Sequence, residues 1–328
     1  MRVGIVLGPD NAFGAPLQCQ RNLYRALMEM DNGFEIVPIK GSVPKGLDIL
    51  HVDNLPFHWW EYARTFKAPH IIAHVHGNLA YSNPELTEYG AWQRVRMRAW
   101  ARVSRRRITH FLPVSHYLRH FLTAWGVDPD RTTTIYNGVD PMFFERPKGV
   151  PPVKGRYILH VSKYQPKKNT EALVRAFPSI RDEHPDLKLV IAGPGHKTGP
   201  SGKAAQGMKG VKVLGKVSID RLTRLYWHAE IFVFPSLHET FGIPIVEAMA
   251  AGVPVVTTRR TSLPEVGGDA AWYVEPTPGA IAEGVIEVMN GKDTRSYMRH
   301  QGQRIARKFT WERAARDVLR VYEGVGKR

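Results

Sequence analysis

Two carboxylates flank a glycine–proline segment in the stretch HETFGIPIVEAMAAGVPVV, residues 238–256. Pro244 fits the first turn of a helix, and Gly242 allows the backbone to approach a ligand closely. We therefore expect Glu239 in the loop before a helix and Glu247 within that helix. A helix N-terminus suits a diphosphate, and carboxylates accept hydrogen bonds from sugar diols. The pattern indicates a sugar-nucleotide site; the alternative is an ordinary parallel-sheet turn with acids near a helix N-terminus.

Lys163 and Lys168 follow another predicted strand, in the segment KYQPKKN of residues 163–169. Fixed cations aimed at a departing phosphate stabilise the negative charge that develops there. Lys163 and Lys168 are therefore candidates for binding a diphosphate. A solvated surface loop is the alternative, because the segment is polar and typical of a turn.

Several segments of the chain resemble retaining glycosyltransferases of family 4, which have the GT-B fold. The stretch from Glu239 to Glu247 resembles the E-x7-E motif of that family. The other similar segments are FLPVSHYLRHFLTAWGV, IYNGVD, ILHVSKYQPKKNTEALVRAF, LVIAGPG, TSLPEVGGDAAWYVEP and FTWERAARDVLRVYEG. The family usually has an arginine where this sequence has Lys163, and a lysine lacks the planar two-pronged contact with phosphate.

The resemblance implies a donor site that lies mainly on the C-terminal domain. It implies that Glu247 holds the ribose diol, that Glu239 holds the sugar, and that the lysines and helix amides hold the diphosphate. The expected donor-binding residues are Gly14, Gly193, Phe241, Gly242, Ile243, Pro244 and Glu247. The expected catalytic residues are His76, Lys163, Lys168 and Glu239.

The N-terminal half contributes a histidine and a glycine to these expectations. His74 and His76 point to the same face of a predicted strand, so one of them can belong to the core. His76 stands at the carboxyl end and matches the position where the family has a histidine near the donor sugar. Gly14 lies in GPDNAFGAP, which resembles the family's glycine-rich loop and lacks the dinucleotide fingerprint G-x-G-x-x-G. A plain strand–helix turn is the alternative for this loop.

No metal or other cofactor is expected. The sequence has no H-E-x-x-H pattern, no cysteine pair and no clear Asp-x-Asp pattern. The single Cys19 rules out an intrachain disulfide and suits a reducing cytoplasm. The family that the chain resembles generally works without a metal.

The elements that position these residues alternate between strands and helices in two series. The predicted strands cover residues 2–7, 34–38, 48–52, 70–75, 110–114, 133–136, 157–162, 187–192, 211–214, 231–234, 254–257 and 271–274. The predicted helices cover residues 16–30, 58–66, 92–106, 116–125, 169–182, 218–228, 244–251, 279–290, 295–307 and 310–324. Such alternation predicts parallel sheets covered by helices on both faces.

The series restarts after the linker-like segment RPKGVPPVKGR, so we expect two α/β Rossmann-like, doubly wound domains that face each other across a cleft. The expected acceptor-binding domain covers residues 1–145, and the nucleotide-sugar domain covers residues 146–308. Residues 309–328 are expected to form a helix that packs back on the first domain. No apolar run approaches the length of a membrane span.

The net charge of +16 favours anionic partners, and one segment concentrates it. AWQRVRMRAWARVSRRR, residues 91–107, contains seven arginines and no acid. As a helix it places Trp92, Val95 and Ala99 on one face and Arg94, Arg98 and Arg102 opposite. It can dock on an anionic membrane or pack as a core helix with a solvated face. Nucleic acid is not expected, because no zinc-finger or RNA-binding signature accompanies the arginines.

Together these features predict a glycosyltransferase that moves a sugar from a nucleotide donor to an acceptor hydroxyl. The resemblance implies retention by front-face displacement, and the segment SLPEVGGDAA favours GDP-mannose over a UDP-sugar. The expected acceptor is a glycan or a lipid-linked molecule, and the expected location is the cytoplasm or the cytoplasmic membrane face. The alternatives are a GT-B epimerase or phosphorylase and a non-catalytic nucleotide-, anion- or membrane-binding protein. The oligomeric state stays open at this point.

Overall fold

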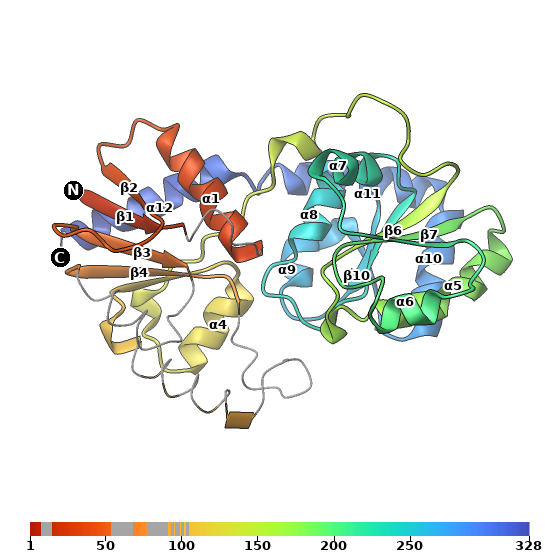
Figure 1. Cartoon of the computed structure of the whole chain (residues 1–328), viewed down its shortest axis with the longest axis horizontal. Coiled ribbons are helices and arrows are strands. Elements are labelled where there is room, and N and C mark those ends of the chain that lie inside the picture. Colours follow the sequence, from red (N-terminus) through yellow and green to blue (C-terminus); the bar gives the residue numbers. More distant parts are fainter. Residues whose placement is uncertain are drawn as a thin grey trace. The chain divides into compact units, whose positions relative to one another are not determined.

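The computed structural model describes residues 1–7, 15–53, 68–77, 91–92, 95, 99, 102 and 105–327. It divides into two compact units, each with its own sheet. The first unit comprises Met1–Gly138 and Trp311–Arg328, and the second comprises Val139–Thr310. The last helix of the chain therefore belongs to the same unit as the first strand (Figure 1).

The first unit is built on a parallel sheet of five strands in the order β2-β1-β3-β4-β5. The strands are β1 (Arg2–Val6), β2 (Glu35–Ile39), β3 (Ile49–Asp53), β4 (His70–Val75) and β5 (His110–Pro113). Two strands contain a proline, Pro38 in β2 and Pro113 in β5. Both are edge strands of the sheet, the position at which a strand tolerates proline.

Three described helices accompany this sheet: α1 (Ala15–Met28), α4 (His116–Ala124) and α12 (Trp311–Gly326). Ser115 caps α4, because its hydroxyl accepts a hydrogen bond from the Leu118 N–H at 3.1 Å. α12 packs against α1, as Figure 1 shows for the blue helix beside the red one. A short 3-10 turn, Pro129–Arg131, follows α4.

The predicted strand at residues 133–136 is wrong. The segment runs beside β5, where the N–H groups of Thr133 and Ile135 donate to the carbonyls of Phe111 and Pro113. One isolated bridge joins Phe111 to Thr132, but no further strand is assigned to this described segment. Pro113 has no N–H to return a bond, so a regular ladder cannot continue past it.

The second unit is built on a parallel sheet of six strands in the order β11-β10-β9-β6-β7-β8. The strands are β6 (Tyr157–Val161), β7 (Lys188–Ala192), β8 (Val211–Gly215), β9 (Ile231–Phe234), β10 (Val255–Thr258) and β11 (Ala271–Val274). β6 pairs with both β7 and β9, so neighbours in the sheet are not neighbours in the sequence at this point. This is the doubly wound strand order.

The helices of the second unit are α5 (Thr170–Glu183), α6 (Pro200–Ala205), α7 (Ile219–Trp227), α8 (Ile243–Ala250), α9 (Leu263–Gly267), α10 (Pro278–Asn290) and α11 (Lys292–Ala306). Short 3-10 turns lie at Pro141–Phe143, Pro166–Lys168 and Gly268–Ala270. α5 packs against α10 on one side of the sheet, and α8 packs against α11.

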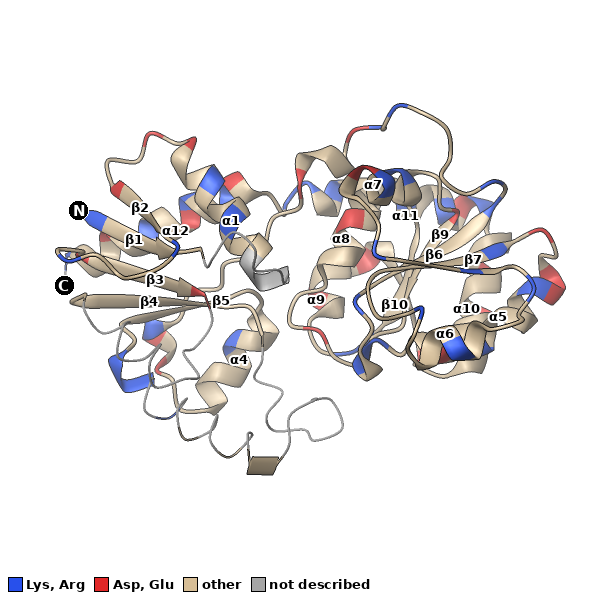
Figure 2. Cartoon of the chain, in the orientation of Figure 1, with Lys and Arg blue, Asp and Glu red and all other residues tan. Residues whose placement is uncertain are grey.

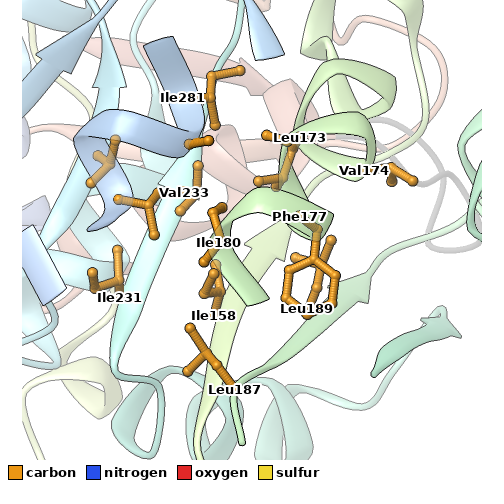
Figure 3. Close-up of a cluster of buried hydrophobic side chains, with 14 of the residues drawn as sticks. Ile158, Leu173, Val174, Phe177, Ile180, Leu187, Leu189, Ile231, Val233 and Ile281 are labelled. Atoms are coloured by element: carbon orange, nitrogen blue, oxygen red, sulfur yellow. The ribbon is translucent and has the colours of Figure 1, made fainter. Parts of the chain in front are cut away.

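The core of the second unit forms between the sheet and the α5–α10 pair. Leu173, Phe177 and Ile180 project from α5 toward Ile158 of β6 and Ile231 of β9 (Figure 3). Their spacing of three and four residues is the one that places side chains on a single helix face. This packing anchors β6 and β9, the two strands that the candidate loops follow.

The structure confirms two parallel-sheet α/β domains. The predicted helix at residues 58–66 lies outside the described residues. The predicted helix at 92–106 lies partly outside them, although residues 91–92, 95, 99, 102 and 105–107 are helical. Lys and Arg residues are spread over helices and loops of both units (Figure 2). Within the described residues, no helix has the length and apolar character that a membrane crossing requires.

Candidate functional site

Each sheet has a point where the strand order reverses, and ligands of such sheets bind beyond the carboxyl ends of the strands there. In the second unit this point lies between β6 and β9. Residues 163–169, here called the lysine loop, follow β6, and the loop that carries Glu239 follows β9. A backbone hydrogen bond connects the two loops: the Leu237 N–H donates to the Lys167 carbonyl at 2.7 Å.

Glu239 is buried and receives several hydrogen bonds. Its Oε1 accepts from Lys168 Nζ at 2.5 Å and from the Ser236 hydroxyl at 2.7 Å. Its N–H donates to Thr261 Oγ1, and its carbonyl accepts from the Ser262 hydroxyl. Burial alone raises the pKa of Glu239, but the charges of the adjacent lysines and the hydrogen bonds hold it below its ordinary value. The group is therefore a carboxylate at neutral pH.

Lys168 ends the 3-10 turn Pro166–Lys168, and Asn169 then adopts a left-handed conformation before α5 begins. Its ammonium group pairs with Glu239 and lies 5.1 Å from the centroid of the Phe234 ring. The side chains of Lys168 and Glu239 are only 13% and 11% exposed. The structure thus brings together one predicted cation and one predicted carboxylate.

Lys163 is exposed at the carboxyl end of β6, and Gly193 stands beside it at the end of β7. Gly193 has φ of +126°, and a Cβ there would lie 1.8 Å from the Ser162 carbonyl oxygen. Only glycine allows this approach of two strand ends. Gly193 therefore has a packing role that is independent of any ligand.

α8 begins directly after Gly242, whose φ of +104° again requires the left-handed region. Phe241 is buried and packs edge-on against Phe309, with ring centroids 5.5 Å apart. Ile243 and Pro244 form the first turn and are half-buried. Pro244 lacks an N–H, so the first turn presents the remaining amides and the positive end of the helix dipole.

Glu247 lies in the middle of α8 and is half-buried. The Tyr226 hydroxyl, from α7, donates to its Oε2 at 2.8 Å. Burial raises the pKa of Glu247 to about 7, with a further contribution from Asp140, and the bond from Tyr226 opposes the shift. The two carboxylates of the motif therefore differ in charge state near neutral pH, since Glu239 is ionised and Glu247 is partly protonated.

Tyr226 and Ser236 are functional candidates that the sequence did not reveal. Tyr226, within the predicted helix 218–228, is fully buried, and its hydroxyl donates a hydrogen bond to Glu247. Ser236, in the loop directly after β9, donates a hydrogen bond from its hydroxyl to Glu239. The contact between Tyr226 and Glu247 joins two different helices, α7 and α8, so spacing along the chain did not signal it. Ser236 and Glu239 lie three residues apart in one loop, but the irregular backbone of a loop gives no fixed spacing from which to predict their contact.

In the first unit, the order reverses between β1 and β3, and the described side chains at that edge include Asp53 and His76. His76 Nε2 lies 3.7 Å from Asp53 Oδ1, and the His76 ring stacks on His74 at 4.3 Å between centroids. The ring centroid of His51 lies 5.5 Å from that of His74, so Asp53, His76, His74 and His51 form a row of neighbouring side chains. His51 Nδ1 lies 2.5 Å from the Tyr322 hydroxyl. His74, in β4, and His76, just after its last residue, thus share a face as predicted, and both are buried.

Burial dominates the protonation of this row. It raises the pKa of Asp53 to about 7 and lowers the pKa of His74 to about 3. Burial, and then the neighbouring histidines, lower the pKa of His76 well below its ordinary value. His76 is therefore a neutral imidazole at physiological pH, able to orient a hydroxyl group but not to supply a fixed positive charge. Asp53 was absent from the sequence-based expectations.

Gly14, Arg94 and Arg98 lie outside the described residues. Arg102 is exposed, and Trp92 is 72% exposed. The core-helix alternative predicts that Trp92 and Trp100 are both buried; the exposed Trp92 ring disagrees with it, and Trp100 lies outside the described residues. Across the described ranges, no three His, Cys, Asp or Glu side chains are grouped so as to hold a metal ion.

Comparison with known proteins places the chain in a family. Residues 142–305, half of the chain, match the family described as Glycosyl transferases group 1, and residues 17–143 match Glycosyltransferase Family 4. The chain belongs to the glycosyl transferases of group 1. The predicted resemblance to family 4 is thereby confirmed.

Two curated relatives of this glycosyltransferase family member are mannosyltransferases. One is the MMP alpha-(1->4)-mannosyltransferase of Mycolicibacterium hassiacum, 31% identical over 71% of this chain and 59% of the relative. The other is the phosphatidyl-myo-inositol mannosyltransferase of Mycobacterium tuberculosis, 30% identical over 58% of this chain and 53% of the relative. The matches span about half the length of such curated relatives.

A solved structure of Anabaena HepE in complex with UDP-glucose has the same fold, with a TM-score of 0.78 and 16% identity over 99% of this chain and 100% of that chain. The predicted GT-B fold class is confirmed by such structural neighbours together with the two parallel sheets.

Proposed function

We propose that this chain transfers a sugar from a nucleotide-sugar donor to a hydroxyl group of an acceptor. The observation that carries the proposal is the buried pair of Lys168 and Glu239 at the switch point of the second sheet. A cation and an ionised carboxylate held side by side, next to the N-terminus of α8, suit a ligand that joins a sugar to a diphosphate. Membership of the glycosyl transferase family supports the same activity.

The proposed donor contacts follow the order of groups in a nucleotide sugar. Glu247 accepts hydrogen bonds from the ribose diol. Lys163, Lys168 and the α8 amides from Ile243 onward bind the diphosphate. Glu239 and the amides near Gly242 bind the sugar. Gly193, Phe241, Pro244 and, beyond the described residues, Gly14 shape the backbone around the donor.

The proposed reaction retains the anomeric configuration. The acceptor oxygen attacks the anomeric carbon from the face on which the bond to the β-phosphate oxygen breaks. The bonding pair leaves with that oxygen, which also takes the acceptor proton. Lys163 and Lys168 stabilise the charge on the departing diphosphate, and Glu239, ionised at neutral pH, fixes the sugar hydroxyls. Neutral His76 orients a sugar hydroxyl or the leaving oxygen.

The proposed donor is GDP-mannose. The mannosyltransferase names of two relatives and the segment SLPEVGGDAA support this choice. A UDP-sugar is the alternative, since the structural neighbour HepE was solved with UDP-glucose. We propose further that transfer needs no metal, so that chelation with EDTA leaves the rate unchanged.

The proposed acceptor is a glycan or a lipid-linked molecule at an anionic membrane surface. The phosphatidyl-myo-inositol mannosyltransferase of the comparison supports a lipid acceptor. Exposed Trp92 and Arg102, on a segment with seven arginines, support peripheral contact with anionic lipid.

The test begins with thermal-shift measurements on UDP-, GDP-, ADP- and dTDP-sugars. Transfer by wild type is then compared with Glu247→Gln and with a matched control, Glu287→Gln, on the exposed face of α10. We expect one donor to stabilise the protein and Glu247→Gln, but not the control, to weaken its binding. A protein stabilised by no nucleotide sugar contradicts the proposal. Donor binding with neither transfer nor donor hydrolysis favours the non-catalytic alternative.

A further inference from the structure

A buried imidazole connects both ends of the loop that carries Lys163 and Lys168. His160, in β6, is fully buried, and its Nε2 lies 2.9 Å from the Ser162 hydroxyl and 3.1 Å from the Thr170 hydroxyl. Ser162 directly precedes Lys163, and Thr170 follows Lys168 by two residues. Two hydroxyls from opposite ends of the loop therefore converge on one nitrogen atom.

The other ring nitrogen fixes which proton His160 carries. Its Nδ1 lies 2.9 Å from the Val233 carbonyl in β9, and a carbonyl oxygen can only accept. Nδ1 therefore carries the hydrogen, and the two hydroxyls share the one lone pair of Nε2 in the neutral ring. Burial, the largest cause, lowers the pKa of His160 to about 3, so the ring stays neutral at physiological pH.

A second buried histidine extends the network to the loop after β7. His196 Nε2 lies 2.9 Å from the Ser162 carbonyl, to which it donates, and its Nδ1 lies 2.9 Å from the Ser201 hydroxyl. His196 and Ser201 are both fully buried. One consistent set of donors and acceptors thus joins β6, β9, α5, α6 and the loop after β7.

A fully satisfied buried polar network is rigid, because breaking any member leaves a partner without a hydrogen bond in a low-dielectric interior. We propose that His160 is a positioning residue that clamps the lysine loop and holds Lys163 and Lys168 in the orientation that binds the diphosphate. This inference rests on the proposed function of the same site, and it adds a residue that contacts no substrate.

If His160 clamps the lysine loop, its loss should weaken binding of the diphosphate and leave binding of the nucleoside unchanged. The ribose is assigned to Glu247 on α8, which the network does not contact. His160→Phe keeps a ring beside Phe234 but removes both nitrogens. We expect this variant to lose about tenfold in affinity for a nucleoside diphosphate, the order expected for a hydrogen bond or two, and to keep the affinity of wild type for the nucleoside.

The experiment is calorimetry with GDP and guanosine, and with UDP and uridine, on wild type and variants. His160→Gln, which retains an acceptor, should restore part of the diphosphate affinity. Ser162→Ala/Thr170→Val removes the two donors with little change of shape and should repeat the loss, even where His160→Phe fails to fold. His300→Phe, an exposed histidine of α11 whose Nδ1 also binds a backbone carbonyl, is the matched control and should behave as wild type.

Nitrogen-15 spectra of the histidine rings supply a readout that needs no ligand. One ring should show the Nδ1–H tautomer with no titration between pH 5 and pH 8, and that signal should vanish in His160→Phe. An Nε2–H tautomer for His160 overturns the clamp. So does unchanged diphosphate affinity, or an equal loss for nucleoside and diphosphate. If wild type binds no nucleoside diphosphate, the proposed function fails and the clamp fails with it, whereas binding by wild type with unchanged variants refutes the clamp alone.

Discussion

The ammonium nitrogen of Lys168 lies 2.5 Å from Oε1 of Glu239, although the two residues are 71 positions apart in the sequence. The pair connects the loop after β6 with the loop after β9, at the point where the strand order of the sheet reverses. Under the proposed function, a diphosphate in this site competes with Glu239 for the charge of Lys168. The pair can therefore hold the cation in place before the donor arrives, which favours a site organised in advance of binding.

Removing Lys168 should leave a buried carboxylate without its nearest cation. We expect Lys168→Ala to lower the free energy of unfolding by about 3 kcal/mol at pH 7, because an uncompensated buried charge is costly. The variant Lys168→Ala/Glu239→Gln should recover part of the loss. Urea unfolding of Lys168→Ala, Glu239→Gln and the double variant measures the coupling free energy between the two side chains. The exposed pair of Arg260 and Glu275 serves as control and should give less than about 1 kcal/mol.

The pH dependence of the pair has a definite sign. The pKa of Glu239 in the folded protein lies below its ordinary value of 4.5. Its contribution to stability is therefore present above pH 4.5 and is lost as the pH falls through the lower, folded value. Lys168→Ala should weaken this acid dependence. An unaltered acid profile in the variant would show that the ion pair does not set the pKa of Glu239.

Nucleotide affinity should depend on pH through Glu247. Its pKa of about 7 means that the carboxylate form grows about tenfold between pH 6 and pH 8. Since the carboxylate is the better acceptor for the ribose hydroxyls, we expect affinity for the nucleoside to rise across this range. Tyr226→Phe removes a hydrogen bond that stabilises the carboxylate and should move the midpoint upward. Isothermal titration at several pH values checks both statements, and a flat profile in wild type contradicts the assignment of Glu247.

The stability of the unliganded protein should change in the opposite direction. A carboxyl whose pKa rises on folding contributes stability that is present below pH 4.5 and is lost as the pH rises through about 7. Glu247→Gln removes this dependence, so it should gain stability relative to wild type as the pH increases from 5 to 8. Thermal unfolding of the unliganded proteins tests this, with Glu287→Gln as the control.

Gly193 tests how far the site depends on the approach of two strand ends. Gly193→Ala forces a Cβ against the Ser162 carbonyl at a φ of +126°, so we expect a loss of about 3 kcal/mol. Gly207 also has a positive φ, +75°, but its added Cβ would meet no atom within 4 Å. Gly207→Ala should therefore cost about 1 kcal/mol, the backbone strain alone. If urea unfolding shows the same loss in free energy of unfolding for both variants, the contact with Ser162 does not contribute to the cost of Gly193→Ala.

The sequence predicted the fold well because the strands and helices have strong local signals. Buried strands such as Ile231–Phe234 are short apolar runs, and Gly242 with Pro244 indicates the start of α8. The strand expected at 133–136 failed for a non-local reason, since Pro113 on the neighbouring strand interrupts the ladder.

Only those features of the site that depend on residues close together in the sequence could be predicted. The spacing of Glu239 and Glu247 is visible in the sequence, whereas the contacts that set their different pKa values come from other elements. Tyr226 lies on α7 and Lys168 follows β6. Nothing in the spacing of His160, Ser162 and Thr170 shows that the three side chains meet at one nitrogen, because that convergence depends on how β6 packs against α5.

The arginine-rich helical segment should bind anionic membranes through its exposed residues. Trp92 is 72% exposed and Val95 is 54% exposed, and the segment carries seven arginines without an acid. Each engaged arginine contributes about 1 kcal/mol near an anionic surface, and salt screens the attraction. We therefore expect co-sedimentation with phosphatidylglycerol vesicles at low salt and its loss at high salt. The variant Arg94→Glu/Arg98→Glu/Arg102→Glu should remain in the supernatant.

A matched variant separates this segment from the general positive charge of the protein. Arg299→Glu/Arg304→Glu/Arg307→Glu makes the same charge change on exposed positions in and just after α11. If net charge alone drives binding, the two triple variants should sediment equally poorly. If the segment docks as expected, the α11 variant should still sediment with the vesicles, and Trp92 fluorescence should shift to shorter wavelength as its ring enters the lipid interface. Failure of wild type to sediment at low salt would remove the membrane role and direct the search for the acceptor to molecules free in solution.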